Sequence, residues 1–161
     1  PARFRVHVQG DDIAWYREIE TTKVKGSDGY LYEPVWMAPE DAEARGIKSG
    51  DIVKVYNERG IILTGARVSQ RIAPGSVVVA KGSRVDPIAP HIDRGGAINL
   101  ISPEATVSKN CKGFAVTGYL IEAEKLTQEE YDSWKKDYPE AFDRAYDAGQ
   151  GITRDAWVVE A

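Results

Sequence analysis

Residues 41–77 read DAEARGIKSGDIVKVYNERGIILTGARVSQRIAPGSV and hold the sequence signals that decide the fold. A helix is predicted over residues 38–46 at the start of this stretch. Pro39 suits the first helical position, and the two acidic residues that follow it favour the positive end of the helix dipole. Gly46 is a good left-handed cap, and Ile47 just beyond it can fold back onto Ala42 to complete the stop.

Two strands follow this helix in the same stretch. The apolar residues of 52–56 and of 61–69 predict a β-hairpin. Asn57-Glu58-Arg59-Gly60 between them is typical of a hairpin turn, with Gly60 at the strained position. Pro74-Gly75 predicts another turn, which leads into a strand over 76–80.

Further short strands are predicted on both sides of this hairpin, at 3–9, 30–37, 97–101 and 114–123. Gly26-Ser27-Asp28-Gly29 predicts a turn before the second of them, and residues 81–98 are expected to form an ordered surface loop. Many short strands joined by glycine and proline turns, with one short helix, are typical of a closed β-barrel. The sequence therefore predicts a mainly β fold over residues 1–125.

The last part of the chain, residues 126–161, is predicted to be a tail with helical and extended parts. Thr127-Gln128-Glu129-Glu130 is a capping box, which predicts a helix to about Asp137. Pro139 then begins a second helix that is expected to stop at Gly149. The aromatic residues of this tail could pack on the barrel, on other domains of the same subunit or on a small electron-transfer subunit, and the sequence leaves these three alternatives open.

Composition indicates one soluble globular domain and excludes several classes of protein. Of 161 residues, 42% are hydrophobic and 29% are charged, which is ordinary for such a domain. No stretch approaches the roughly 18 apolar residues that cross a bilayer. The one cysteine, Cys111, cannot form an intramolecular disulfide or hold a zinc or iron–sulfur site alone. Because the chain does not begin with Met, we expect it to be a piece of a longer protein.

Charge argues against nucleic-acid binding but favours an anionic ligand. The formal net charge is −4, and residues 124–161 hold ten acidic against five basic side chains. A protein that coats nucleic acid needs a basic face instead. A locally basic stretch is nevertheless present, formed by Arg67, Arg71, Lys81, Arg84, Arg94, Lys109 and Lys112. It predicts either a solvated barrel surface or a site for a phosphate-bearing ligand.

No catalytic or metal-binding set is found in the sequence. His7 and His91 are the two histidines, and neither stands in a Ser-His-Asp or Cys-His arrangement. The phosphate-binding GxxxxGKS loop is absent. We therefore expect no catalytic residue and no metal ligand in this chain, and an inert thiol at Cys111.

The motifs of 41–77, taken together, resemble the molybdopterin dinucleotide-binding domain that ends the large subunits of the dimethyl sulfoxide reductase family. The family pattern is an acidic-Ala helix, Arg-Gly-Ile, Gly-Asp, a strand, Asn-x-Arg-Gly, a strand and a Pro-Gly turn. It stands here at Asp41-Ala42, Arg45-Gly46-Ile47, Gly50-Asp51, Asn57-Glu58-Arg59-Gly60 and Pro74-Gly75. Flanking motifs also match, at residues 3–11, 97–103 and 108–112, so the resemblance covers about residues 3–125. Asp86-Pro87, Asp93-Arg94-Gly95-Gly96 and 121–125 are similar to the hydroxyl-transferring branch, the pyrogallol–phloroglucinol transhydroxylases.

This resemblance implies a double-psi β-barrel that covers one side of molybdopterin guanine dinucleotide, whose molybdenum or tungsten takes its protein ligand from another domain. It implies an enzyme acting on phenolic aromatics, in which this segment alone is not catalytic. The partners implied are the remaining domains of the large subunit and a small iron–sulfur subunit, without nucleic acid or membrane. A bacterial cytoplasmic location is expected, with the periplasm as the alternative. The cofactor-binding residues that it implies are His7, Gln9, Gly10, Arg94, Asn99, Lys109 and Lys112.

The chemistry of such a ligand suits these side chains. A dinucleotide presents phosphates, sugars and polar rings, so it needs backbone N–H groups, amides and a few cations. Asn99 both donates and accepts, and it stands in the apolar run 97–101, where a buried amide without a partner costs about 1–3 kcal/mol. The alternatives are a turn satisfied by Asn99, solvated Lys109 and Lys112, and a His7 bonded to a nearby carbonyl.

Three other functions are weighed against this one. The first is another molybdenum or tungsten oxidoreductase of the same family. The second is a pyruvoyl-dependent decarboxylase on the same barrel, for which Gly26-Ser27, Gly75-Ser76 or Gly82-Ser83 would supply the self-cleaving bond. The third is an adaptor barrel without activity, which would leave the His7 and Asn99 motifs without a task.

Overall fold

The computed structural model describes residues 22–106, 108–110, 113 and 118–143. The strand predicted over 3–9 and the first part of the strand predicted over 114–123 lie outside these residues. The elements, in chain order, are β1 (Val24–Lys25), β2 (Leu31–Met37), α3 (Pro39–Ala44), β3 (Ile52–Asn57), β4 (Gly60–Val68), β5 (Val77–Val79), β6 (Pro87–Ala89), β7 (Ile92–Asp93), η2 (Ile98–Leu100), β8 (Glu122–Lys125), α4 (Gln128–Asp137) and α5 (Pro139–Asp143).

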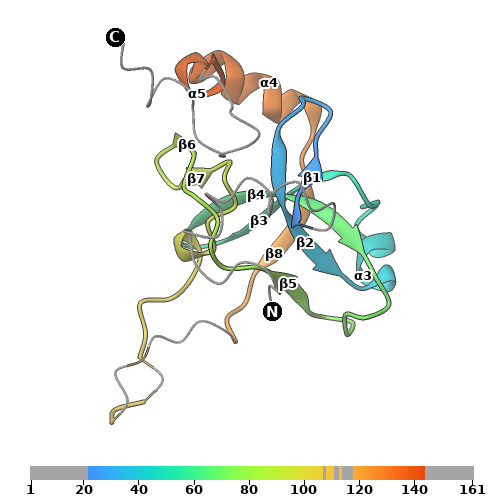
Figure 1. Ribbon diagram of the computed structural model, residues 1–161, viewed down its shortest axis with the longest axis vertical. Helices are drawn as coiled ribbons and strands as arrows, with labels where there is room; N and C mark the ends of the chain where they lie inside the picture. The colour runs from blue at the N-terminus through green and yellow to red at the C-terminus, as the bar shows by residue number, and fades with distance from the viewer. Residues whose placement is uncertain (1–21, 107, 111–112, 114–117, 144–161) are drawn as a thin grey trace, which may run out of the picture.

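The fold is mainly β, as predicted, and one mixed sheet forms its centre (Figure 1). Its main path runs β1-β2-β4-β3-β8; β5 pairs with β2, and β7 joins β4 to β6. β3 and β4 form the predicted antiparallel hairpin, whereas β2 runs parallel to β4. Among the described residues the sheet is open rather than closed into a barrel. A count of short strands predicts how much sheet there is, but it does not say which edges meet.

The helix at the start of residues 41–77 forms as predicted. α3 begins at Pro39, and Gly46 has a left-handed backbone with φ of 64°. The Ile47 amide donates to the Ala42 carbonyl at 2.8 Å, and both side chains are buried in one cluster. The local signals of residues 38–47 therefore fix this helix and its stop.

Gly60 is needed in the hairpin for a different reason from the one predicted. The backbone at Gly60 is not left-handed, so the prediction that Gly60 occupies the strained position of the turn was wrong. A Cβ at Gly60 would instead lie 2.8 Å from the His91 carbonyl oxygen and 2.9 Å from Leu100 Cγ. Glycine is required here because two other segments approach the hairpin closely.

Two predictions after β5 are also wrong. The loop predicted over 81–98 contains the short antiparallel pair β6–β7, and the strand predicted over 97–101 is the 3₁₀ turn η2. The Ile98 carbonyl accepts hydrogen bonds from the amides of Ile101, at 3.2 Å, and Ser102, at 3.1 Å. A short apolar run has no periodicity that separates a strand from a helical turn, which is why the sequence misled here.

The two faces of the sheet pack into two separate clusters, because successive side chains of a strand point to opposite faces. Ile62 and Ala66 of β4 lie in one cluster, and Leu63 lies in the other. We call the first the inner cluster: Val35, Met37, Ala42, Ile47, Val53, Val55, Ile62, Ala66, Ile101 and Ala123. We call the second the tail cluster: Tyr32, Leu63, Ile88, Leu126 and Ala141, with partly buried Tyr30, Ile52, Ile61, Ala89, Ile92, Tyr131, Trp134, Tyr138 and Phe142 around them.

The described part of the tail, residues 126–143, packs on the sheet. The capping box at Thr127 and Glu130 forms as predicted, and α4 ends at Asp137. Tyr131, Trp134 and Phe142 pack against the tail cluster, and Lys54 of β3 pairs with Glu130 at 2.5 Å. Figure 1 shows α4 and α5 together at one end of the sheet. Of the three surfaces considered for the tail, the structure therefore shows the sheet; the domain boundary at 125/126 stays a prediction.

In the part of the chain that the structure describes, no helix combines the length and the apolar character that a membrane span requires.

Candidate functional site

Asn99 lies in the middle of η2 and is exposed to solvent. The expectation of a buried amide in an apolar strand was therefore wrong, because the backbone turns here and presents the side chain outward. No hydrogen bond joins this amide to any residue that the structure describes. A primary amide in this state can donate two hydrogen bonds and accept others from a ligand placed against the turn.

The turn that carries Asn99 is held by contacts with the inner cluster and with the β3–β4 hairpin. Ile101, only 1% exposed, anchors it in the inner cluster. The Asn57 side chain donates from Nδ2 to the Ile101 carbonyl at 2.7 Å. Leu100 packs where Gly60 has no side chain. The exposed amide thus stands on a turn whose neighbours are fixed, which is the arrangement that binding sites on rigid scaffolds use.

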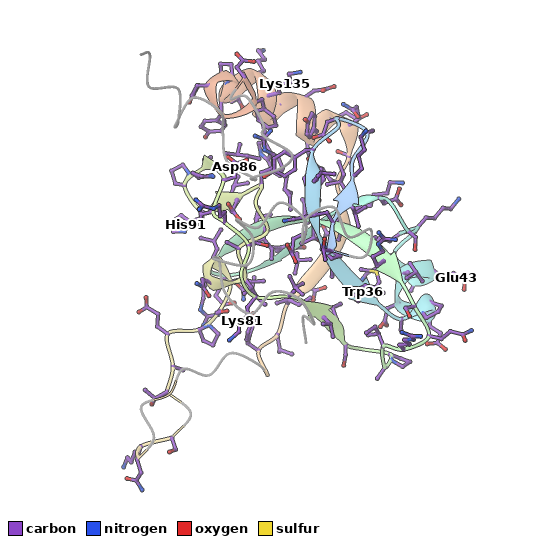
Figure 2. All side chains as sticks on the ribbon, in the orientation of Figure 1. Trp36, Glu43, Lys81, Asp86, His91 and Lys135 are labelled. Carbon is purple, nitrogen blue, oxygen red and sulfur yellow. The ribbon has the colours of Figure 1, made fainter. Side chains whose placement is uncertain are left out.

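His91 stands next to the same hairpin and was missed by the sequence reasoning. Its backbone has φ of 63°, a left-handed conformation that no other described non-glycine residue adopts. The Ile61 amide donates to the His91 carbonyl at 2.8 Å, and His91 Nδ1 lies 3.1 Å from the Arg59 carbonyl oxygen. Figure 2 shows His91 at the edge of the molecule. Strained non-glycine residues gather at functional sites, so this backbone outlier marks a candidate.

Three segments that carry polar side chains therefore meet around Gly60: the turn with Arg59, the turn with His91, and η2 with Asn99. Arg59 pairs with Glu58 at 2.5 Å, and its side chain is 38% exposed. The sequence signal that could have found this junction is the Asn57–Gly60 turn itself, since a glycine with close neighbours implies that other segments cross there.

Among the described residues, no other predicted cofactor-binding residue is shown at this junction. Lys109 is exposed on the segment that projects away from the sheet in Figure 1. His7, Gln9, Gly10 and Lys112 lie outside the described residues, so their roles stay predictions.

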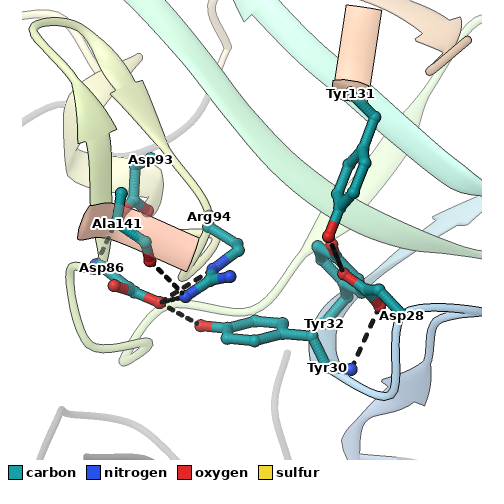
Figure 3. Close-up of polar contacts among 8 residues, drawn as sticks. All are labelled: Asp28, Tyr30, Tyr32, Asp86, Asp93, Arg94, Tyr131 and Ala141. Carbon is teal, nitrogen blue, oxygen red and sulfur yellow. Dashed lines mark hydrogen bonds and ion pairs between the residues drawn. The ribbon is translucent and has the colours of Figure 1, made fainter. Parts of the chain in front are cut away.

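Arg94 is buried, 5% exposed, and its guanidinium has internal partners (Figure 3). Nε and Nη2 donate to Asp86 Oδ2 at 3.1 and 3.0 Å, and Nη2 also donates to the Ala141 carbonyl at 3.0 Å. The guanidinium carbon lies 4.4 Å from the ring centre of Tyr30 and 5.2 Å from that of Phe142. Burial lowers the pKa of Arg94, the Asp86 carboxylate raises it, and the net shift is upward.

Asp93, beside Arg94, is 2% exposed and accepts backbone hydrogen bonds. Oδ1 accepts from the Asp86 amide at 2.6 Å, and Oδ2 accepts from the Ala97 amide at 2.7 Å. Burial raises the pKa of Asp93, and these amides act against that shift. The Asp93-Arg94 pair therefore faces the interior and the tail, whereas the sequence motif implied that Arg94 meets a ligand.

A second polar cluster joins the β1–β2 turn to α4. Asp28 Oδ2 accepts from the hydroxyls of Tyr32, at 2.7 Å, and Tyr131, at 2.9 Å. Burial, followed by the charge of Asp28, raises the pKa of both tyrosines. Both hydroxyls therefore stay protonated donors at neutral pH. The cluster borders a groove of about 1010 Å³, whose lining also includes Arg94 and Phe142.

No group of three metal-ligating side chains occurs within the described ranges. Cys111 lies outside them.

The comparisons with known proteins point to one family. The model of the molydopterin dinucleotide binding domain matches residues 14–118. The pyrogallol hydroxytransferase large subunit of Pelobacter acidigallici is 36% identical over 134 residues, 81% of this chain and 15% of that protein. The dimethyl sulfoxide/trimethylamine N-oxide reductase of Cereibacter sphaeroides is 38% identical over 98 residues, 58% of this chain and 12% of that protein. The chain thus spans 15% or less of the length of these two relatives.

A solved structure supports the fold. Acetylene hydratase from Pelobacter acetylenicus superposes with a TM-score of 0.51 at 14% identity, over 69% of this chain and 15% of that one. The family match confirms the predicted cofactor, molybdopterin guanine dinucleotide, and it gives no support to the pyruvoyl alternative. The chain belongs to the molydopterin dinucleotide binding domain family of the dimethyl sulfoxide reductase-type molybdoenzymes.

Proposed function

We propose that this chain is the cofactor-binding part of a hydroxyl-transferring molybdoenzyme that acts on phenolic aromatics, and that the Asn99 turn contacts the cofactor. The observation that carries the contact is the exposed Asn99 amide, which no described residue satisfies, on a turn fixed by Asn57 and Ile101. An amide that donates and accepts suits the edge of a pterin or a guanine.

The residues at this junction fit the chemistry of the group. Asn99 provides the amide, and Arg59 and His91 provide positive charge and a ring N–H for a phosphate. Lys109 adds a cation from the projecting segment. His7, Gln9, Gly10 and Lys112 complete the proposed set through the family resemblance. Arg94 supports the site without contacting the cofactor, since its guanidinium is bound by Asp86 and Ala141. When bound, the group supplies oxygen-atom and electron transfer at its molybdenum or tungsten.

The finer fold and the finer specificity belong to the same proposal. A double-psi barrel would be completed by the strand predicted at 3–9, which carries His7 and Gln9. Hydroxyl transfer on trihydroxybenzenes is favoured because the hydroxytransferase relative aligns over 81% of the chain, against 58% for the sulfoxide reductase relative. The proposed partners are the other domains of the large subunit and a small iron–sulfur subunit, without nucleic acid or membrane, in the bacterial cytoplasm.

The test is a substrate panel on the purified enzyme that carries this domain. We expect hydroxyl transfer between trihydroxybenzenes, with little reduction of dimethyl sulfoxide or trimethylamine N-oxide. The isolated 161-residue chain should bind no molybdenum and show no turnover, since no catalytic residue is proposed in it. Sulfoxide reduction without hydroxyl transfer would replace the proposed specificity by that of another oxidoreductase of the family, and turnover by the isolated chain would overturn the division of labour.

A further inference from the structure

We propose that Arg94 is a positioning residue for the Asn99 turn, and that the C-terminal tail takes part in the cofactor site by holding Arg94 in place. The proposal rests on the proposed contact between Asn99 and the cofactor. Its physical content is a chain of contacts from α5 through Arg94 and Asp93 to the first residue of η2.

The first step joins the tail to Arg94. Phe142 of α5 and Tyr30 of the sheet lie against the guanidinium, at 5.2 and 4.4 Å from its carbon. The Ala141 carbonyl of α5 accepts from Nη2 at 3.0 Å. Because a planar guanidinium can stack and donate at the same time, Arg94 suits this place and a lysine would not.

The second step joins Arg94 to the segment that enters η2. The Arg94 side chain holds the Asp86 carboxylate, and the Arg94 amide donates to the Asp86 carbonyl at 2.8 Å. The Asp86 amide donates to Asp93 Oδ1 at 2.6 Å. Residues 86 and 93–94 are thus joined by both side-chain and backbone bonds; Asp93 and Arg94 are buried, and the Asp86 side chain is 14% exposed.

The third step passes from Asp93 to the Asn99 turn. Asp93 Oδ2 accepts from the amide of Ala97, the residue that precedes η2, at 2.7 Å. Between them the backbone at Gly95 and Gly96 packs closely against neighbouring segments. A Cβ at Gly95 would lie 2.0 Å from the Arg84 carbonyl oxygen, and Gly96 has φ of 77° with the Glu33 side chain 2.6 Å from where its Cβ would be. A displacement of Arg94 therefore reaches η2 through a segment with little slack.

A purely structural role for Arg94 predicts something different. It would lower the stability of the whole chain, so that sheet amides, which exchange with solvent on global unfolding, would be affected at least as much as η2. A positioning role predicts a local effect, in which η2 opens more often than the sheet unfolds.

The experiment is amide hydrogen exchange, followed by NMR, on the 161-residue chain. The variant is Phe142→Ala, which removes one contact with Arg94 and leaves the Arg94–Asp86 pair intact. We expect exchange of the Leu100, Ile101 and Ser102 amides to rise about tenfold more than exchange of the β3–β4 amides. An equal or smaller rise in η2 than in β3–β4 would overturn the proposal.

Two further variants keep this test sharp. Tyr131→Phe is the matched control: it removes the bond from α4 to Asp28 and keeps the ring that packs on Phe142, so the ratio of η2 to sheet exchange should stay unchanged. Arg94→Lys keeps the positive charge but loses the planar guanidinium with its paired donors. It should raise the ratio of η2 to sheet exchange as Phe142→Ala does. A rise with Tyr131→Phe as large as with Phe142→Ala would assign the effect to tail packing in general and contradict a role for Arg94.

The readout needs no cofactor, so the two proposals fail separately. If Asn99→Ala leaves the pterin content of the enzyme unchanged while the exchange ratio rises in Phe142→Ala, Asn99 is not a cofactor contact but the bracing of η2 stands. If the pterin content falls and the ratio does not rise, the cofactor contact stands and the positioning role is withdrawn.

Discussion

The inner cluster and the tail cluster lie on opposite faces of one sheet and are built in different ways. The inner cluster is aliphatic, and its members run from Val35 to Ala123. The tail cluster is rich in aromatic rings and is bordered by the Asp86–Arg94 pair and by the tyrosine hydroxyls on Asp28. An aliphatic core is stabilised by burial and close packing, whereas the second face also depends on matched polar partners.

This difference teaches where the site obtains its support. The Asn99 turn is anchored in the inner cluster through Ile101 and is connected to the tail face through Asp93 and Arg94. The predictions below test whether the two faces separate in stability as they do in chemistry.

The largest expected effect is that of deleting residues 126–161. The deletion uncovers Tyr32, Leu63 and Ile88, so we expect a loss of about 5 kcal/mol in the free energy of unfolding, from about 1.5–3 kcal/mol for each such side chain. The sheet should still melt cooperatively, because the inner cluster contains no residue beyond Ala123. Urea unfolding measures both; a chain without a cooperative transition would show that the tail belongs to the same core.

The next effect compares two neighbours on β4. Ile62→Ala should cost about 3 kcal/mol, because Ile62 is fully buried in the inner cluster. Ile61→Ala should cost clearly less, because Ile61 is only partly buried on the tail face. The pair is matched in residue type and strand, and equal losses in urea unfolding would refute the separation into two faces.

A smaller effect is expected at the hydroxyl of Tyr131. Tyr131→Phe keeps the ring contact with Phe142, at 5.3 Å between ring centres, and removes one donor to Asp28. We expect a loss of about 1 kcal/mol in the free energy of unfolding. Tyr32→Phe should cost at least as much, because the Tyr32 hydroxyl donates to the same oxygen from a fully buried ring. A loss at Tyr131 larger than that at Tyr32 would contradict this account of the cluster.

The smallest effect is a pH dependence of the α4–β3 contact. The hydrogen bond from Lys54 lowers the pKa of Glu130 below its ordinary value of 4.5. A carboxyl with a lowered folded pKa contributes stability above its unfolded pKa and loses it as pH falls through the folded pKa. The stability difference between the wild type and Glu130→Gln should therefore shrink between about pH 6 and about pH 3. Glu129→Gln, an exposed neighbour, controls for the loss of one charge, and a constant difference at Glu130 would argue against the pairing.

Local signals predicted the parts of the fold that local contacts decide. The α3 helix with its Gly46 stop, the 57–60 turn and the Thr127 capping box each depend on residues within a few positions. The reason for Gly60 and the turn at η2 depend on segments that meet only in the folded chain. Sequence spacing cannot show such meetings.

The candidate site divides in the same way. Motif resemblance pointed to Asn99, but the burial that was expected of it is absent; the exposed amide is accessible to a ligand, and its ligand role stays a proposal. Arg94 matched the motif as well, yet its partners at Asp86 and Ala141 come from distant parts of the sequence. A basic residue in a motif indicates that a positive charge is needed, but its partners can be identified only from the folded structure.

The central claim is that the exposed amide of Asn99 meets the cofactor, and pterin content tests it most directly. We would measure pterin per protein in the enzyme that carries this domain, for the wild type, for Asn99→Ala and for Gln128→Ala, an exposed amide on α4, together with the melting temperature of the 161-residue chain. We predict that Asn99→Ala lowers the pterin content and leaves the melting temperature nearly unchanged, while Gln128→Ala changes neither. Full pterin content in Asn99→Ala, with a clearly lowered melting temperature, would show that Asn99 serves the fold and would contradict the account.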